Sequence, residues 1–116
     1  IAFLGVTFKA NTDDMRESSS LIMIPSLVNK GAKIKYYDPS GIKKDFEKLK
    51  NVTYSKNIKK ACEDADLIII HTEWNDFKSI NFKTLSKKNA IIYDMRNILS
   101  AEKMKKEKIK YFGIGG

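Results

Sequence analysis

The residues best suited to bind a ligand are one lysine and two arginines that follow short apolar segments. Lys9 comes directly after the apolar residues 1–8, and Arg16 lies further along the same polar stretch. Arg96 follows a second apolar segment at residues 90–94. Cationic side chains near a helix start can hold an anion, and the arginine fork matches the oxygens of a diphosphate. The spacing therefore indicates a site for a phosphorylated ligand.

The same arginines also have an explanation without any ligand. Asp13 and Asp14 stand shortly before Arg16, and Asp94 stands shortly before Arg96. Each guanidinium group could therefore form a local ion pair that serves structure alone. Both interpretations stay open at this point, because charge pairs occur at structural and at functional sites.

The other reactive residue types are expected to be structural. His71 ends an apolar run and is expected to be buried rather than to act as a base. Cys62 lies in a helical segment and has no basic partner in a neighbouring loop that would activate its thiol, so we expect it to pack in the core. Trp74 is expected in the core or at an interface, and Asp38 is expected to cap a turn rather than to bind a ribose. One thiol and one histidine cannot build a zinc site, so we expect no metal site.

Alternating strand and helix patterns predict the elements that position these residues. We expect strands at residues 1–8, 32–38, 52–54, 66–72, 90–94 and 111–114, and helices at residues 17–30, 42–49, 58–65, 77–88 and 101–108. This order predicts an α/β fold, namely a Rossmann-like, doubly wound, mainly parallel sheet of about six strands with helices on both faces. Ligands bind beyond the carboxyl ends of strands in such sheets, so the candidate residues should share one edge.

The loop after the first strand lacks the sequence of a dinucleotide cradle. Such a cradle needs Gly-x-Gly-x-x-Gly after the strand. Here only Gly5 is present, and we expect it inside the strand. We therefore expect a loop too bulky to wrap a pyrophosphate in the usual way.

Composition narrows the class of protein. The chain of 116 residues suits one domain, and 42% hydrophobic residues argue against disorder. The net charge of +8 invites a nucleic-acid interpretation, but the basic residues are nearly all lysines spread over several helices, so we expect no nucleic-acid partner. No apolar run approaches the roughly 20 residues of a membrane span, so we expect no membrane partner. A lone cysteine without a signal peptide predicts a cytoplasmic location.

Five motifs, in order along the whole chain, resemble one known family. Residues 4–9 and 12–18 resemble the opening G-x-x-F-K-x-x-T-D-D-x-R-x-S of the C-terminal domain of UDP-glucose/GDP-mannose dehydrogenases. The other motifs of that domain, G-A … Y-D-P, T-E-W-x-x-F, D-x-R-N and Y-x-G-I-G, resemble residues 31–39, 72–77, 94–97 and 111–115.

The resemblance implies that residues 1–116 form a single nucleotide-sugar-binding C-terminal domain, a fragment of a longer dehydrogenase. Such enzymes oxidise C6 of a nucleotide sugar twice, with NAD⁺ held mainly by an N-terminal domain, and form homodimers through a central region. The start without an initiator Met fits a fragment. The Thr72-Glu73-Trp74 motif looks most like the UDP-glucose branch, which makes UDP-glucuronate for polysaccharide biosynthesis. A dehydrogenase for UDP-N-acetylhexosamine or GDP-mannose, and a stand-alone nucleotide-binding or regulatory module, remain as alternatives.

The resemblance also assigns roles by position. Its substrate contacts fall on Lys9, on Phe8 beside it and on Arg96. Arg16 would reach across the interdomain cleft to NAD⁺, and Asp13 and Asp14 would orient Lys9 and Arg16. The catalytic cysteine, lysine and aspartate of the family lie upstream, so no catalytic residue is expected in this segment. We therefore expect the fragment alone to be inactive.

Overall fold

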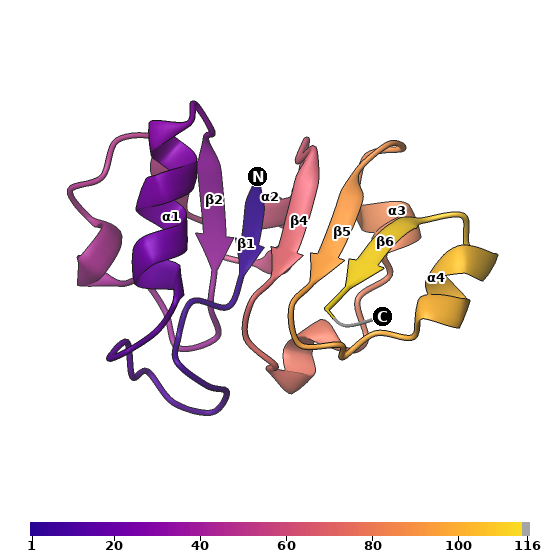
Figure 1. The fold of residues 1–116 in the computed structure, drawn as a ribbon, viewed down its shortest axis with the longest axis horizontal. Coiled ribbons are helices and arrows are strands. Elements are labelled where there is room, and N and C mark those ends of the chain that lie inside the picture. Colours follow the sequence, from indigo (N-terminus) through magenta and orange to yellow (C-terminus); the bar gives the residue numbers. More distant parts are fainter. Residues whose placement is uncertain (115–116) are drawn as a thin grey trace.

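The computed structural model describes residues 1–114, in which helices pack on both faces of one parallel sheet (Figure 1). The strands in chain order are β1 (Ala2–Leu4), β2 (Ile34–Tyr37), β3 (Val52–Tyr54), β4 (Leu67–Ile70), β5 (Ile91–Asp94) and β6 (Lys110–Gly113). Their order across the sheet is β3-β2-β1-β4-β5-β6, and each neighbouring pair is parallel. This is the strand order of the Rossmann fold, and it confirms the predicted fold class. Gly115 of the expected last motif lies outside the described residues.

The helices divide between the two faces of the sheet according to the direction of each connection. They are α1 (Ser20–Asn29), α2 (Ile58–Cys62), α3 (Phe82–Leu85) and α4 (Ala101–Lys106), with short 3₁₀ turns η1 (Lys44–Phe46) and η2 (Asn75–Phe77). In Figure 1, α1 lies in front of the sheet, whereas α2 and α3 lie behind it. Right-handed crossovers explain this, because the chain steps one way from β1 to β3 and the other way from β3 to β6. No helix within residues 1–114 has the length and apolar character needed to cross a membrane.

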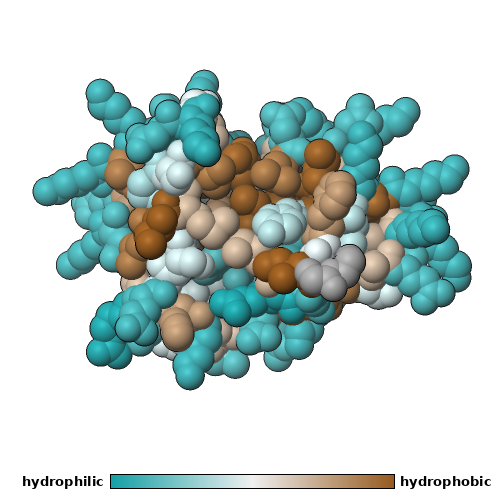
Figure 2. Space-filling model, viewed as in Figure 1, coloured by the Kyte–Doolittle hydropathy of each residue, from teal (hydrophilic) through white to brown (hydrophobic). Residues whose placement is uncertain are grey.

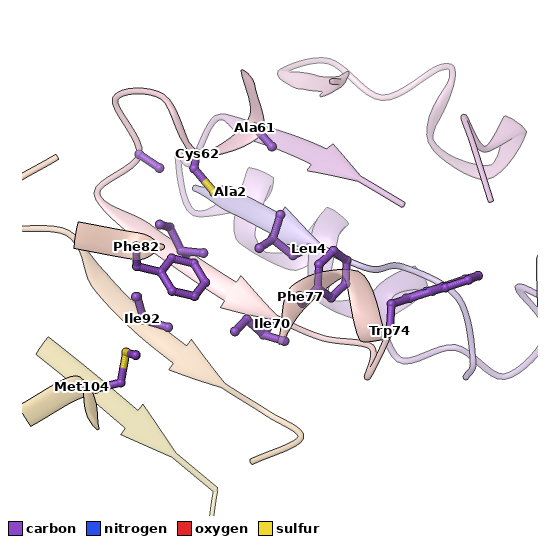
Figure 3. Close-up of a cluster of buried hydrophobic side chains, with 12 residues drawn as sticks. Ala2, Leu4, Ala61, Cys62, Ile70, Trp74, Phe77, Phe82, Ile92 and Met104 are labelled. Carbon is purple, nitrogen blue, oxygen red and sulfur yellow. The ribbon is translucent and has the colours of Figure 1, made fainter. Parts of the chain in front are cut away.

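Alternating strand side chains build an apolar layer on each face of the sheet. Ile70 and Ile92 point towards α2, α3 and α4. Phe82, the first residue of α3, packs against them (Figure 3). Phe3 and Ile69 point the other way and pack with residues of α1. All five side chains are almost fully buried. Burying each contributes about 1.5–3 kcal/mol, so both layers stabilise the sheet that positions the site.

Several elements are shorter than the sequence predicted. The strand expected at residues 1–8 ends at Leu4, because Gly5 takes a φ of +81° that no strand residue adopts. The helix expected at residues 42–49 forms only the turn η1. The helix expected at residues 77–88 is split into η2 and α3, and Thr84 and Ser86 there bond main-chain carbonyls instead of supporting a longer helix.

Candidate functional site

The carboxyl ends of the strands lie along one edge of the sheet, the lower edge in Figure 1. The connection between β1 and α1, residues 5–19, forms much of this edge. Asp38 follows β2, Thr72 lies shortly after β4, and Asp94 ends β5. The segments that carry the candidate residues therefore share this edge, as predicted for a parallel sheet.

Gly5 begins the connection at a close crossing with the segment after β4. A Cβ atom at Gly5 would lie 2.6 Å from the Cβ of Thr72 and 3.0 Å from its backbone nitrogen. The backbone N–H groups of His71 and Thr72 both donate to the carbonyl of Leu4, at 2.9 and 3.4 Å. The missing side chain therefore allows the exits of two central strands to touch.

Asp38 holds the backbone of Val6 and Thr7, the next residues of the same connection, by hydrogen bonds. Its carboxylate is fully buried, and Oδ2 accepts from the backbone N–H groups of Val6 and Thr7 at 2.7 and 3.3 Å. Its Oδ1 accepts from the backbone N–H and the hydroxyl of Ser40 at 2.9 and 2.6 Å. Both oxygens are thus engaged with the protein, which confirms that Asp38 caps a turn and leaves it no free oxygen to bind a ribose.

A chain of buried hydrogen bonds connects α1 to the main chain of Lys9. The Thr72 hydroxyl donates to the carbonyl of Thr7 at 3.0 Å, so it accepts from Nδ1–H of His71 at 2.9 Å. Nε2 of His71 then accepts from the Ser19 hydroxyl at 2.8 Å. At the far end, the Thr7 hydroxyl donates to the carbonyl of Lys9 at 3.1 Å. This network fixes the histidine tautomer and supports the loop that carries Lys9.

Neither His71 nor Cys62 is prepared for acid–base or nucleophilic chemistry. Burial, aided by the nearby charge of Arg96, lowers the pKa of His71 to about 4. A base with so low a pKa is nearly always neutral and weak at pH 7. Burial raises the pKa of the Cys62 thiol to about 12, so thiolate is scarce. Both residues have the structural character expected from the sequence.

The depressed pKa of His71 predicts an acid-sensitive fold. The folded pKa of about 4 lies below the usual 6.5, so the unfolded chain binds the proton first as the pH falls. The stabilisation is complete above pH 6.5 and is lost towards pH 4, with a loss of about 1.4 kcal/mol by pH 5.5. Urea unfolding at pH 7.5 and 5.5 measures this difference. His71→Asn should remove most of it, and an equal pH dependence in wild type and variant would contradict the assignment.

Lys9, Asp14 and Arg16 form a charged group on the exposed part of the connection. The Arg16 guanidinium donates to both oxygens of Asp14, each at 3.1 Å, and lowers the pKa of that carboxyl, to which Lys9 adds a smaller effect. The Arg16 side chain is nevertheless 90% exposed. The backbone N–H of Phe8 donates to the carbonyl of Asp14, and the Phe8 side chain is exposed. Asp13 is exposed and makes no side-chain hydrogen bond within the described chain.

Arg96 is held at the same edge without pairing to Asp94. Its Nε donates to the carbonyl of His71 at 2.9 Å, and its terminal nitrogens have no partner among residues 1–114. The buried Asp94 instead accepts from the Tyr111 hydroxyl at 2.8 Å and from the backbone N–H of Leu99 at 2.9 Å. The alternative of a local Arg96–Asp94 side-chain pair is therefore wrong. Arg96 keeps donors free for a ligand.

The start of α1 does not fit the pyrophosphate of a dinucleotide. The first backbone N–H groups are already bonded, from Ser20 to the Ser18 hydroxyl and from Leu21 and Ile22 to the carbonyls of Ser18 and Ser19. The hydroxyls of Ser18 and Ser20 both donate to the carbonyl of Val6 at 2.6 Å. These serines tie the helix to the loop, and the donors that a pyrophosphate needs are used internally.

A group of lysines lies at the opposite, amino edge of the sheet. A hollow of about 600 Å³ at the amino ends of β5 and β6 is lined by six lysines, Lys83, Lys87, Lys88, Lys106, Lys108 and Lys110. Lys87 pairs with Asp66, and Lys106 lies in the last turn of α4, where a cation offsets the helix dipole. These six lysines contribute part of the net charge of +8 at a place distant from the candidate site.

Comparison with protein families shows where this arrangement recurs. Residues 2–101 match the model of the UDP-glucose/GDP-mannose dehydrogenase family, UDP binding domain. A UDP-glucose 6-dehydrogenase from Rickettsia typhi is 42% identical over 99% of the chain, and one from Rhizobium meliloti is 35% identical over 99%. In both cases the chain spans only 27% of the length of the relative.

Solved structures share the fold along nearly the whole chain. A UDP-glucose dehydrogenase from Pyrobaculum islandicum superposes with a TM-score of 0.74 and 28% identity, over 95% of this chain and 24% of that chain. An NDP-N-acetyl-D-galactosaminuronic acid dehydrogenase from Methanosarcina mazei superposes with a TM-score of 0.81 and 25% identity, over 98% of this chain and 24% of that chain.

Proposed function

Because this chain belongs to the UDP-glucose/GDP-mannose dehydrogenase family, whose UDP-binding domain it matches, we propose that it supplies the UDP-sugar site of an NAD-dependent UDP-glucose 6-dehydrogenase. The full-length protein would oxidise UDP-glucose to UDP-glucuronate for polysaccharide biosynthesis and reduce two NAD⁺. Residues 1–116 would be one domain of it, and the upstream chain would bind NAD⁺ and carry the catalytic residues.

The observation that carries this proposal is an exposed cation on a rigidly supported loop. Lys9 is exposed, but its main chain is held by Thr7, which is in turn fixed by Asp38 and by Thr72. A site works best when its binding groups sit on backbone that needs no reordering. Lys9 would contact the anionic UDP-sugar and the exposed Phe8 ring would pack beside it.

Arg96 would provide a second contact to the substrate. Its Nε is fixed by the carbonyl of His71, and its terminal nitrogens face no partner in the described chain. A guanidinium held in this way can offer two parallel donors to phosphate oxygens. The hydrogen bonds from Lys9 through Thr7, Thr72 and His71 link the backbone of Lys9 to the side chain of Arg96.

The chemical steps would belong to other parts of the full-length protein. Oxidation of an alcohol through the aldehyde level to a carboxylate needs a base and a thiolate as well as the nicotinamide. Here the thiol of Cys62 and the imidazole of His71 have pKa values on the wrong sides of neutrality for these tasks. The start of α1 does not fit NAD⁺, so no step of the reaction is assigned to this domain.

The domain by itself is expected to bind substrate weakly and to produce no NADH. It has apolar layers on both faces of the sheet, so we expect the purified 116-residue chain to fold. Calorimetric titration with UDP-glucose, UDP-N-acetylglucosamine and GDP-mannose would test both binding and preference, and NADH absorbance would test activity. Absence of binding to any of these ligands by a folded chain and by the full-length protein would refute the proposal. NADH production that depends on Cys62 would reverse the division of labour.

We also propose that the full-length protein is a cytoplasmic homodimer joined through upstream chain. A single buried free cysteine suits a reducing compartment. The length of the parent gene separates this enzyme from a stand-alone nucleotide-binding or regulatory module. A gene that encodes only this domain would favour the module.

Arg16→Ala is expected to weaken NAD⁺ use more than substrate binding. The Arg16 side chain is 90% exposed and is oriented by Asp14, so it can reach a neighbouring domain without losing a buried contact. Removal of one charged hydrogen bond of about 1.5 kcal/mol would raise the KM for NAD⁺ about tenfold in the full-length enzyme. Lys59→Ala, which removes an exposed positive charge from α2 behind the sheet, is the control. An unchanged KM for NAD⁺ with weakened UDP-glucose binding would move Arg16 to the substrate site.

A further inference from the structure

The sheet face that carries α1 is covered over only half of its width. In Figure 1, α1 lies on the β2 side, and no helix of residues 1–114 lies in front of β4, β5 and β6. The opposite face is covered by α2, α3 and α4. Strands of parallel sheets are normally buried on both faces. The uncovered half is therefore a surface that the described chain does not complete.

A row of side chains across this face shows where the cover ends. Phe3, Ile69, Tyr93 and Phe112 are in register on β1, β4, β5 and β6 and point to the α1 side. Their exposure rises along the row, from 0% at Phe3 and 3% at Ile69 to an intermediate value at Tyr93 and 59% at Phe112. Figure 2 shows apolar surface across the middle of this face with hydrophilic residues around it. We name the exposed part, formed by Tyr93, Phe112 and Ile91 on β5 and β6 and by Leu67 on β4, the front apolar surface.

The topology places no helix of residues 1–114 over this half of the face. Right-handed connections from β3 to β4, β5 and β6 must pass over the face of α2, α3 and α4. The connections that pass over the α1 face belong to β1, β2 and β3, on the other half of the sheet. Any helix in front of β4 to β6 must therefore come from another part of the protein or from another molecule.

The dimensions of the front apolar surface fit one helix. Three strands spaced about 4.8 Å apart span about 10 Å, which is the diameter of a helix with its side chains. Four-residue strands are about 13 Å long, which equals roughly nine helical residues. A second copy of this chain fits less well, because a two-fold contact would bring the Lys110 side chains of β6 towards each other in a chain of charge +8.

We propose that a helix from the chain upstream of residue 1 packs on the front apolar surface, with an apolar stripe towards β4, β5 and β6 and acidic residues towards Lys110. The inference rests on the proposed function, in which this domain belongs to a dehydrogenase of which it forms about a quarter, as in its relatives. Ile1 lies at the amino end of β1, which neighbours β4, and its side chain packs with the cluster on the α1 side, so upstream chain would start beside this face (Figure 1). The helix would fix the domain relative to the rest of the enzyme.

Thiol labelling of the full-length protein tests whether the surface is covered. Phe112→Cys places a thiol on β6, and Lys59→Cys places a matched thiol on the exposed side of α2 behind the sheet. Peptide mapping follows each introduced thiol separately, because Cys62 is buried but the catalytic cysteine expected upstream would also react. We expect the Phe112→Cys thiol to react with a maleimide at least tenfold more slowly than the Lys59→Cys thiol. Equal rates would overturn the proposal.

Crosslinking identifies what covers the surface. Phe112 is replaced by the photoreactive p-benzoylphenylalanine in an equal mixture of ¹⁵N-labelled and unlabelled full-length chains. Links within one chain to an upstream helix support the proposal, whereas links between labelled and unlabelled chains, or no link at all, overturn it. UDP-glucose binding is measured on the same variants. Retained binding with an uncovered surface would sink only this inference, and lost binding in the unmodified protein would sink the proposed function instead.

Discussion

Replacing Gly5 by alanine is expected to lower the free energy of unfolding by roughly 2–5 kcal/mol. The backbone of Gly5 has a φ of +81°, in a region that costs an alanine about 1–2 kcal/mol. The added Cβ would also meet the Cβ of Thr72 at 2.6 Å, and overpacking of this kind costs about 1–3 kcal/mol. Because a Cβ and a backbone nitrogen cannot rotate away, the two exits of β1 and β4 would have to separate.

Gly31→Ala is the matched control for the close approach. Gly31 also has a positive φ, +98°, but a Cβ there would meet no atom within 4 Å. We expect this variant to lose only the conformational part, about 1–2 kcal/mol. Urea unfolding of both variants gives the difference. Equal losses would show that the loop moves aside at little cost and that the crossing with Thr72 does not constrain it.

The sequence predicted the architecture well because its strongest signal is local. Residues 67–70 are apolar on both sides, as a central parallel strand must be, and β4 lies in the middle of the sheet. Lengths were predicted less well. The helix expected at residues 77–88 has apolar residues at suitable spacing, but only Phe77 and Phe82 are deeply buried, so two short turns are enough to place them.

The charged part of the site was also predictable, whereas its support was not. Lys9 and Arg16 lie in one stretch of sequence, so a motif can show them together. The support joins Thr7 to Thr72 and His71, which are far apart in the chain and meet only because β1 and β4 are neighbours. A pattern of residues along the chain does not show which distant residues come into contact in the fold. Gly5 was the one residue whose type could have indicated this contact. It was predicted to lie inside a strand, whereas it follows β1 and allows the close approach to Thr72.

The buried supporting residues and the proposed binding residues should make separable contributions in this arrangement. Asp38, Thr72 and His71 are buried and should affect stability when changed, whereas Lys9 and Arg16 are exposed and should affect mainly binding. A substitution at an exposed lysine therefore tests function with little disturbance of the fold.

Lys9→Ala is expected to weaken UDP-glucose binding by the full-length enzyme about ten- to a hundredfold. A charge-assisted contact to a phosphorylated ligand contributes roughly 1.5–3 kcal/mol to the binding free energy. Because the loop is already supported, little of this is offset by the cost of ordering its backbone. The backbone of Lys9 is bonded through its carbonyl to Thr7, a bond that alanine retains, so the loop should keep its shape. Calorimetric titration with UDP-glucose and with UDP measures the loss directly.

Lys59→Ala removes the same charge from α2 and controls for the overall field of the domain, because Lys59 is exposed behind the sheet. If Lys9 acts by contact, Lys59→Ala should leave the affinity for UDP-glucose within about twofold. Lys9→Arg should recover part of the affinity that Lys9→Ala loses, because the charge returns with a different shape.

Raising the salt concentration should reduce the difference in affinity between wild type and Lys9→Ala, since screening weakens an exposed charge contact. Equal small losses in Lys9→Ala and Lys59→Ala would mean that only net charge matters and would remove Lys9 from the site. A loss for Lys9→Ala alone, present with UDP as well as UDP-glucose, would place the contact on the nucleotide rather than on the sugar.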